Sequence, residues 1–426
     1  MGELANQYDA SLAHFALRRS PKRGSRRQIG EFLAKTISVL FLITAAELFV
    51  GGGGRLLDTG AISPRMMLFA IALVASAAYI VLADRIAGGL ALGLVLSALF
   101  VIVHFPAFVL ASVSSVTDED VFLDLSPISY WLAAPFIAIA LMKHDTVAKV
   151  ATVVRWSAVA MACAYLLTLF AVFVGALNYD TLYTSLNEST EFFFRGGGFL
   201  FFKGFLYLGI GAIFILASNS RFKGIMLAIV LAALIMSLTR GLVLATALSA
   251  VMFLFAMRKW KLLIILGSFL VVASGFLFVY APDDGGAELL EQRESSNAVR
   301  TDDIKYFNEN LDVQTLITGR GFGAALNGRT NVEISYLMIV WKYGLAAMVF
   351  WFAPVLLGLY YYSKVRRKDK NFPLATAFMF STFLVYIQTA TNPYLNNPIG
   401  LSFVLIAVFA LRTLALNTLP PIKRLN

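Results

Sequence analysis

The sequence predicts an all-α protein that crosses a membrane about twelve times and carries one large polar loop. Of its 426 residues, 59% are hydrophobic, and the mean hydropathy is +0.77. Apolar runs that approach or reach the roughly 20 residues needed to cross a bilayer recur along the whole chain. Backbone groups in lipid must be bonded within their own segment, so these runs are predicted to be helices. The period-2 alternation of a transmembrane barrel is absent.

The apolar runs set the predicted boundaries along the chain. A basic segment at 1–31 comes first, then the first nine helices within 32–281 and the large loop at 282–332. The last three helices lie within 333–416, before a short tail at 417–426. The seventh and eighth runs are separated only by a short turn, but about 34 apolar residues are too many for one crossing. The predicted spans are 32–50, 65–83, 88–112, 127–142, 156–177, 197–217, 224–239, 241–257, 262–281, 333–361, 373–391 and 398–416.

Charge predicts the orientation of the helices. If residues 1–31 are cytoplasmic, every loop on the same side is rich in lysine and arginine. The loops on the other side collect the acids, above all 282–332. This positive-inside pattern predicts cytoplasmic termini and an external large loop. It also explains the formal net charge of +10 by topology and lipid contacts, so no nucleic-acid partner is expected.

Residue types exclude several kinds of site. The chain has one cysteine, Cys163, so an intramolecular disulfide is ruled out. The 3 histidines are scattered, so a histidine metal site is not expected, and no cofactor is predicted. Residues 1–30 are polar and basic without an apolar core. We therefore expect no cleavable signal peptide, and the first helix would serve as the insertion signal.

Arg240 is the first candidate site residue, because it lies between two apolar helices at the external face. It could simply reach the interface and cap a helix end. Alternatively it binds an anion, since the next helix points its free N–H groups the same way. Arginine also binds phosphate through two parallel hydrogen bonds, which lysine cannot copy.

The large loop offers further arginines. Arg293 and Arg300 lie two turns apart in 287–311, a segment of helical character, so they share a face. They either pair with neighbouring acids or bind an anion. Arg320 lies in a G-x-G-x-G run that lacks the spacing and βαβ context of a dinucleotide site. The glycines would instead let the backbone approach a ligand or a neighbouring helix, and Arg320 is a further anion candidate.

One acid and a few aromatic side chains complete the candidates. Glu333 opens the predicted tenth span, where a carboxylate is either structural or, at depth, suited to act as a general base. Tyr336, Tyr394 and Arg195 lie in or beside external segments and are predicted to contact glycan. An interfacial aromatic belt is the alternative explanation for the tyrosines.

Two regions resemble motifs of the O-antigen ligase and polymerase superfamily. A helix that ends in Ser-x-Thr-Arg-Gly at 237–241, followed at once by another helix, is similar to its S-x-S-R-G turn. Residues 319–345 resemble its G-x-G … H-N-x-x-L … G-hydrophobic-G region. Ligases carry a histidine before the asparagine, but here Thr330 precedes Asn331. This departure favours the polymerase branch (Wzy-type).

The resemblance implies an enzyme of a bacterial inner membrane with a GT-C-like architecture and a periplasmic active site. It would join undecaprenyl-diphosphate-linked repeat units into O-antigen, capsule or exopolysaccharide without a metal ion, and a chain-length regulator is an expected partner. Glu333 would act as the base and Arg240 would stabilise the leaving group. The arginines expected to hold the diphosphate are Arg240, Arg293, Arg300 and Arg320.

Two alternatives stay open at this point. A ligase of the same superfamily would transfer glycan to a lipid A core or another acceptor. A transporter or flippase would move lipid-linked sugars without making a bond, and about twelve helices would suit it. A transporter does not, however, need a large external loop such as 282–332.

Overall fold

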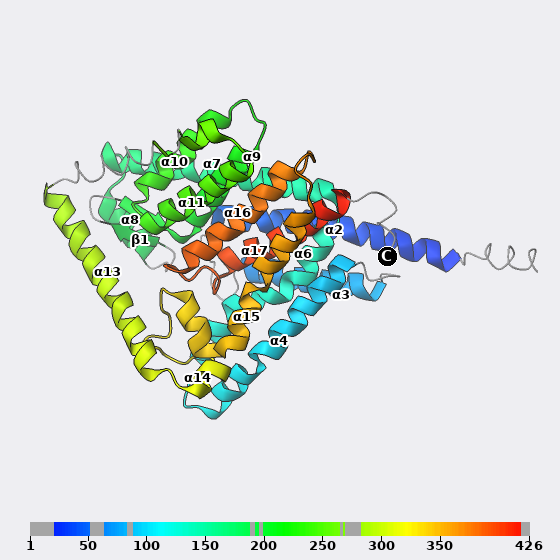
Figure 1. Cartoon of the computed structure of the whole chain (residues 1–426), viewed down its shortest axis with the longest axis horizontal. Coiled ribbons are helices and arrows are strands. Elements are labelled where there is room, and N and C mark those ends of the chain that lie inside the picture. The colour runs from blue at the N-terminus through cyan, green and yellow to red at the C-terminus, as the bar shows by residue number, and fades with distance from the viewer. Residues whose placement is uncertain are drawn as a thin grey trace, which may run out of the picture.

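The computed structural model describes residues 21–51, 64–82, 88–187, 192–195, 199–264, 267–268 and 283–418. These residues form a mostly helical bundle (Figure 1). Within them, 7 helical segments are long and apolar enough to cross a membrane. They are α2 (Pro21–Gly51), α4 (Gly88–Val113), the continuous segment of α5 (Asp118–Ile128), η1 (Ser129–Ala133) and α6 (Ala134–Ala140), α7 (His144–Phe173), α15 (Ser335–Lys364), α16 (Phe372–Thr389) and α17 (Pro398–Thr418).

Shorter apolar helices fill the remaining predicted positions. They are α3 (Pro64–Leu82), α9 (Leu206–Ala217), α10 (Lys223–Met236) and α11 (Arg240–Ala256). Every predicted span overlaps one of the helices described so far except 262–281, which lies almost entirely outside the described residues. The polytopic helical class is therefore confirmed, while the count of about twelve crossings stays a prediction.

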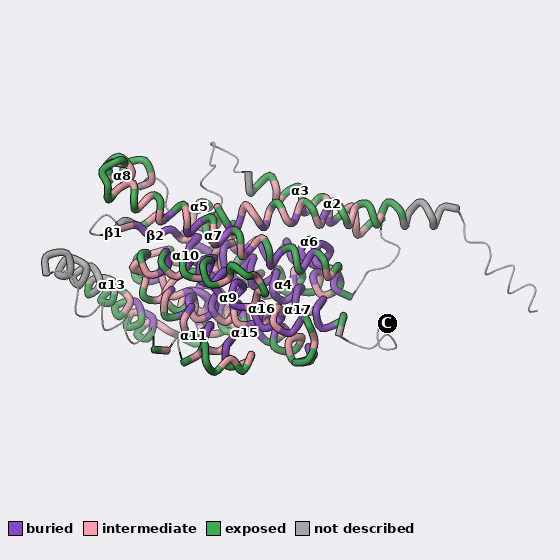
Figure 2. The backbone as a smooth tube through the Cα atoms, turned by 90° about the horizontal axis from the view of Figure 1, so that it is seen from above, coloured by how far each residue is buried: buried purple, intermediate pink, exposed green. Residues whose placement is uncertain are grey.

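Two helices form the centre of the bundle. Every residue of α9 from Leu206 to Leu216 is buried, and 89% of the apolar window of α17 is buried. Helix α9 packs against α7, α10, α11 and α16, and α17 packs against α15 and α16. In contrast, only 28% of the windows of α2 and α4 is buried, so most of their apolar surface would face lipid. Figure 2 shows this division as a purple interior with greener outer helices.

One short sheet departs from the all-α prediction. Strand β1 (Phe192–Arg195) pairs antiparallel with β2 (Phe199–Phe202), with Phe192 opposite Phe202. The predicted span 197–217 is therefore wrong at its start, where β2 and η3 (Lys203–Phe205) precede α9. Paired phenylalanines explain the difference, because aromatic residues pack well across strands and the rings of Phe192 and Phe202 stack at 4.8 Å.

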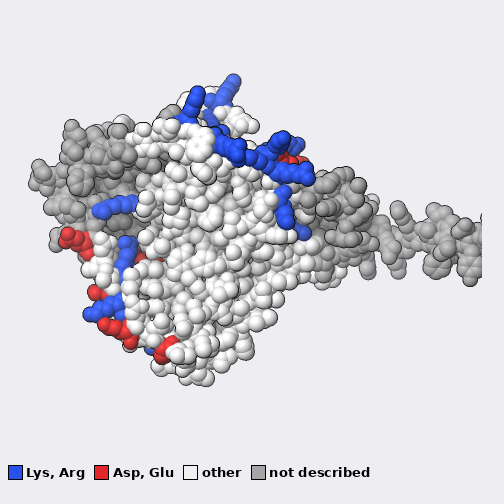
Figure 3. Space-filling view, viewed as in Figure 1, with Lys and Arg blue, Asp and Glu red and all other residues white. Residues whose placement is uncertain are grey.

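The basic loops meet at one end of the bundle. His144 Nε2 lies 2.9 Å from Asn371 Oδ1, which joins the starts of α7 and α16. Arg367 donates to the carbonyl of Ala256 at the end of α11, at 2.7 Å. In Figure 3 lysines and arginines gather along the upper edge, and a second group that holds most of the acids lies at the lower left. Which end faces the cytoplasm stays a prediction from the positive-inside rule.

The acid-rich end is built around the segment before α15. This segment contains α13 (Asp283–Asn310), which corresponds to the predicted loop helix, and α14 (Val313–Thr318). Helix α13 runs along the outer edge of the molecule (Figure 1). A small second core, with Trp341 of α15 at its centre, packs this segment against α15; its other buried members are Phe307, Leu326, Val332 and Met338.

Candidate functional site

The turn between α10 and α11 presents Arg240 at a helix start. Ser237 and Leu238 end the first helix, with Leu238 at a φ of 51°, and Thr239 is the N-cap of α11. The first backbone bond of α11 runs from Val243 N to Thr239 O at 3.1 Å. The N–H groups before Val243 therefore lie outside the ladder. Arg240 is exposed, and its guanidinium has no hydrogen bond or ion pair within the described part of the chain. A cation beside free N–H groups is suited to bind an anion.

The first turn of α11 lies against the last turn of α16. A Cβ atom added to Gly241 would lie 2.9 Å from Thr391 Oγ1 and 3.5 Å from both amide atoms of Gln388. The start of α15 reaches the same part of α16, because Tyr336 donates to the carbonyl of Tyr386 at 2.6 Å. The starts of α11 and α15 therefore meet around the end of α16, and this junction forms the candidate site.

Glu333 precedes Tyr336 in the chain and lies outside the helix. Glu333 was expected to open the tenth helix, but helix α15 begins later, at Ser335. Arg300 donates to Glu333 Oε2 from Nε at 2.7 Å, and the ion pair closes at 2.6 Å. The side chain of Glu333 is 45% exposed. It is therefore a carboxylate held in place by an arginine and open to solvent, and it is not buried at membrane depth.

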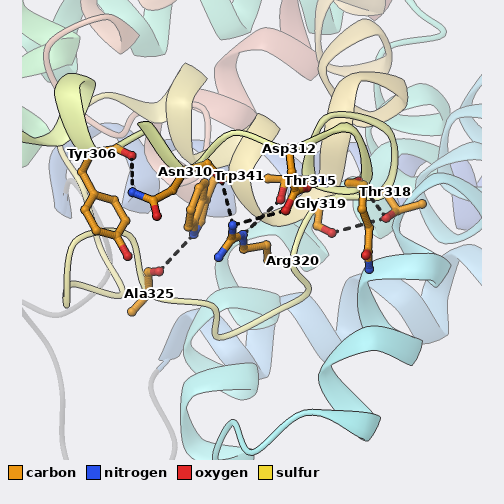
Figure 4. Close-up of polar contacts among 10 residues, drawn as sticks. Tyr306, Asn310, Asp312, Thr315, Thr318, Gly319, Arg320, Ala325 and Trp341 are labelled. Atoms are coloured by element: carbon orange, nitrogen blue, oxygen red, sulfur yellow. Dashed lines mark hydrogen bonds and ion pairs between the residues drawn. The ribbon is translucent and has the colours of Figure 1, made fainter. Parts of the chain in front are cut away.

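Arg320 is held within the loop (Figure 4). It donates to Thr315 Oγ1 at 3.0 Å and to the carbonyl of Asn310 at 2.8 Å. Its guanidinium also lies over the Trp341 ring, 4.2 Å from the centroid. Asp312 Oδ2 is 3.6 Å away, and the backbone N–H of Thr315 lowers the pKa of that carboxyl. These partners leave Arg320 fewer donors for an anion than Arg240 has.

Two further charged pairs anchor the loop, and the sequence did not indicate either of them. Arg329 pairs with Asp303, an acid of α13 that is 1% exposed. Lys342 of α15 donates to both carboxylate oxygens of Asp124, at 2.7 and 2.6 Å, and to the carbonyl of Thr330 at 2.7 Å. Both side chains of the second pair are buried, at 2% and 7% exposure. Acidic runs in external segments look solvated in a sequence, so only the fold reveals these partners.

The glycines of the G-x-G-x-G run serve helix packing. Gly319, Gly321 and Gly323 all have positive φ. A Cβ atom on Gly321 would lie 2.9 Å from Ala111 N and 3.0 Å from Ala107 O of α4. A side chain on Gly319 would overlap the backbone of Lys342. Of the two predicted uses of these glycines, the structure shows close approach to neighbouring helices.

The remaining predicted residues have different surroundings. Tyr394 is 3% exposed and donates to the carbonyl of Lys203 at 3.1 Å, which is a packing position. The Tyr336 ring stacks on Phe352, with centroids 5.8 Å apart. Arg195 ends β1 and Arg293 lies within α13, but their side chains are outside the described residues. Glycan contact by Arg195, Tyr336 and Tyr394 stays a prediction.

The described residues contain no group of three or more histidine, cysteine, aspartate or glutamate side chains that could hold a metal ion. The charged groups on the elements around the junction are an exposed arginine at the start of α11 and an arginine–glutamate pair before α15. Arginine at a helix start has the donors to bind an anion.

The fold and this site define a polytopic helical membrane protein with an exposed arginine at the start of α11. No family model matches the sequence, and no solved structure matches it. The chain is similar to an O-antigen polymerase of Shigella flexneri, with 26% identity over 368 residues, which are 85% of this chain and 91% of that protein. The similarity reaches far beyond the two motifs and supports the resemblance to O-antigen polymerases.

Proposed function

We propose that this protein joins undecaprenyl-diphosphate-linked oligosaccharide repeat units into a polysaccharide at the periplasmic face of a bacterial inner membrane. The similarity to an O-antigen polymerase over 85% of the chain carries this proposal. The junction of α11, α15 and α16 supports it, because the reaction needs an anion site for the leaving diphosphate and a base for the attacking hydroxyl.

Arg240 is the proposed ligand of the leaving diphosphate. Its guanidinium and the free N–H groups of the first turn of α11 both bring positive charge to the start of this helix. Arg300 and Arg320 already have internal partners, so they are weaker candidates for the same role. Arg293 stays a second candidate, since it lies in α13, on the same large loop as Arg300 and Arg320.

The proposed reaction is a glycosyl transfer in one displacement. A hydroxyl oxygen of the acceptor sugar bonds to the anomeric carbon of the donor, and the bond from that carbon to the diphosphate oxygen breaks. The electron pair stays on the diphosphate, where Arg240 and the helix N–H groups stabilise the added charge. Glu333, oriented by Arg300, takes the hydroxyl proton. Direct displacement would invert the anomeric configuration.

A gel of glycan length tests the proposal. The purified protein is given the lipid-linked repeat unit in the presence of EDTA, with Arg240→Gln as the matched control of lowered activity. We expect a ladder of increasing length from the unaltered protein. A single unchanged band would overturn the proposal. A ligase would instead elongate only an added lipid A core acceptor, and a flippase would move the substrate between leaflets without changing its length.

A further inference from the structure

Gln388, in the last turn of α16, has a buried side-chain amide. The residue is 1% exposed, and among the described residues neither Nε2 nor Oε1 has a hydrogen-bond partner. Buried polar groups in folded proteins are almost always bonded, and an unpaired one is costly. The next residue shows the ordinary pattern, because Thr389 Oγ1 donates to the carbonyl of Val385 at 2.7 Å. The amide of Gln388 is therefore available to bond a ligand.

The amide faces the proposed diphosphate site. Both its nitrogen and its oxygen would lie 3.5 Å from a Cβ atom at Gly241, the residue after Arg240. Residue 241 has no side chain, and the hydroxyl of Thr391 occupies the space beside it, 2.9 Å from where a Cβ atom would lie. In this structure the amide is covered, and the half-buried side chain of Thr391 lies against the same glycine. Entry of the ligand therefore requires Thr391 to turn aside.

The chemistry of the amide distinguishes it from the other groups at the site. A phosphate offers only acceptors, and Arg240 with the helix N–H groups already supplies donors. An amide donates through Nε2 and accepts through Oε1, so both of its atoms can be used only by a ligand that offers an acceptor and a donor, as hydroxyl groups do. Sugars offer such groups, and the sugar joined to the diphosphate must lie directly beside it.

We propose that Gln388 contacts the sugar attached to the diphosphate, and that its amide fixes the orientation of that sugar for transfer. The inference rests on the proposed function, because it requires a lipid-linked glycan at Arg240. It adds a specificity contact to the site, since a buried amide rejects ligands that leave it unpaired. The lipid carrier without sugar lacks this contact.

Binding to two probes tests the proposal on the full chain in lipid nanodiscs. The probes are undecaprenyl diphosphate without sugar and the undecaprenyl-diphosphate-linked repeat unit from a polymerase-deficient strain of the source bacterium. For Gln388→Met we expect about tenfold weaker binding of the repeat unit and unchanged binding of the bare carrier. Thr389→Val is the matched control and should change neither. Arg240→Gln should weaken both.

Equal binding of the repeat unit by Gln388→Met and the unaltered protein would overturn this inference alone, provided that the unaltered protein still makes the ladder. Equal weakening of both probes would also overturn it, because the amide would then act on the diphosphate. If Gln388→Met fails to fold, Gln388→Asn takes its place, since it keeps a buried amide but withdraws it from the approach at Gly241. An unaltered protein that makes no ladder would overturn the proposed function itself.

Discussion

Arg240 is the residue at which the sequence and the structure agree most closely. The sequence places it between two helices, and the structure makes it the first residue of α11, exposed and without a partner among the residues that the structure describes. We predict that Arg240→Gln lowers the rate of polymer formation about 100-fold, because it removes a donor to the leaving diphosphate. The melting temperature should not change. Rates of ladder formation and thermal unfolding in detergent would measure the two effects.

Arg320→Gln provides the contrast to this prediction. The guanidinium of Arg320 bonds to Thr315 and Asn310 and stacks on Trp341. Its loss should lower the melting temperature, and it should reduce activity only as far as the loop unfolds. A loss of activity equal to that of Arg240→Gln, at an unchanged melting temperature, would show that Arg320 binds the diphosphate as well.

Glu333 allows a test of the proposed base. We predict that Glu333→Gln lowers kcat about 100-fold or more with little change in KM, because the amide cannot take the hydroxyl proton. Arg300→Gln should lower kcat less, since it removes only the group that orients the carboxylate. Steady-state rates over a range of substrate concentrations would separate the two parameters. A raised KM at unchanged kcat for Glu333→Gln would move the base elsewhere.

The residues that the sequence could not place are those whose partners are distant in the chain. Asp124 and Asp303 read as ordinary acids of external segments, yet both are buried and paired with Lys342 and Arg329. Gln388 gave no signal, because a single amide near a helix end is common. The position of Arg240 could be predicted, because the turn that holds it is formed by its neighbours in the chain.

At the scale of elements, the buried pair of Asp124 and Lys342 joins the segment after α4 to α15. We predict that Lys342→Met destabilises the fold by about 3–5 kcal/mol, because it leaves the Asp124 carboxylate buried without its counter-charge. Thermal unfolding in detergent would measure this. The double variant with Asp124→Leu should recover part of the loss, and a double variant as unstable as the single one would contradict the explanation.

Hydropathy located the helices well, because length and apolar content are properties of each segment alone. It failed where packing decides the conformation. The apolar run at 197–217 begins as a strand, since β2 finds β1 as its partner. Helix α15 is kinked at Gly344, where φ is 77°, because the chain at Ile317 passes close against it. Neither contact can be read from the segment itself.

At the scale of the whole molecule, the separation of charges predicts which end is exposed to each compartment. We predict that a cysteine at Asp302, in a Cys163→Ala background, reacts with a membrane-impermeant maleimide in intact spheroplasts, whereas a cysteine at Lys368 reacts only after lysis. Both positions are exposed. Gel shifts of the labelled protein would give the result, and the reverse pattern would invert the proposed topology.

The two helices joined by the turn at Arg240 are short. Helix α10 has 14 residues and α11 has 17, so at 1.5 Å per residue they reach only about 21 and 26 Å, against about 30 Å of hydrocarbon. A bilayer that meets these helices must thin, or the turn must lie below the phospholipid phosphates. The diphosphate of a carrier lipid would then descend to reach the arginine. Polymer synthesis in nanodiscs should therefore slow as the acyl chains of the surrounding lipid lengthen.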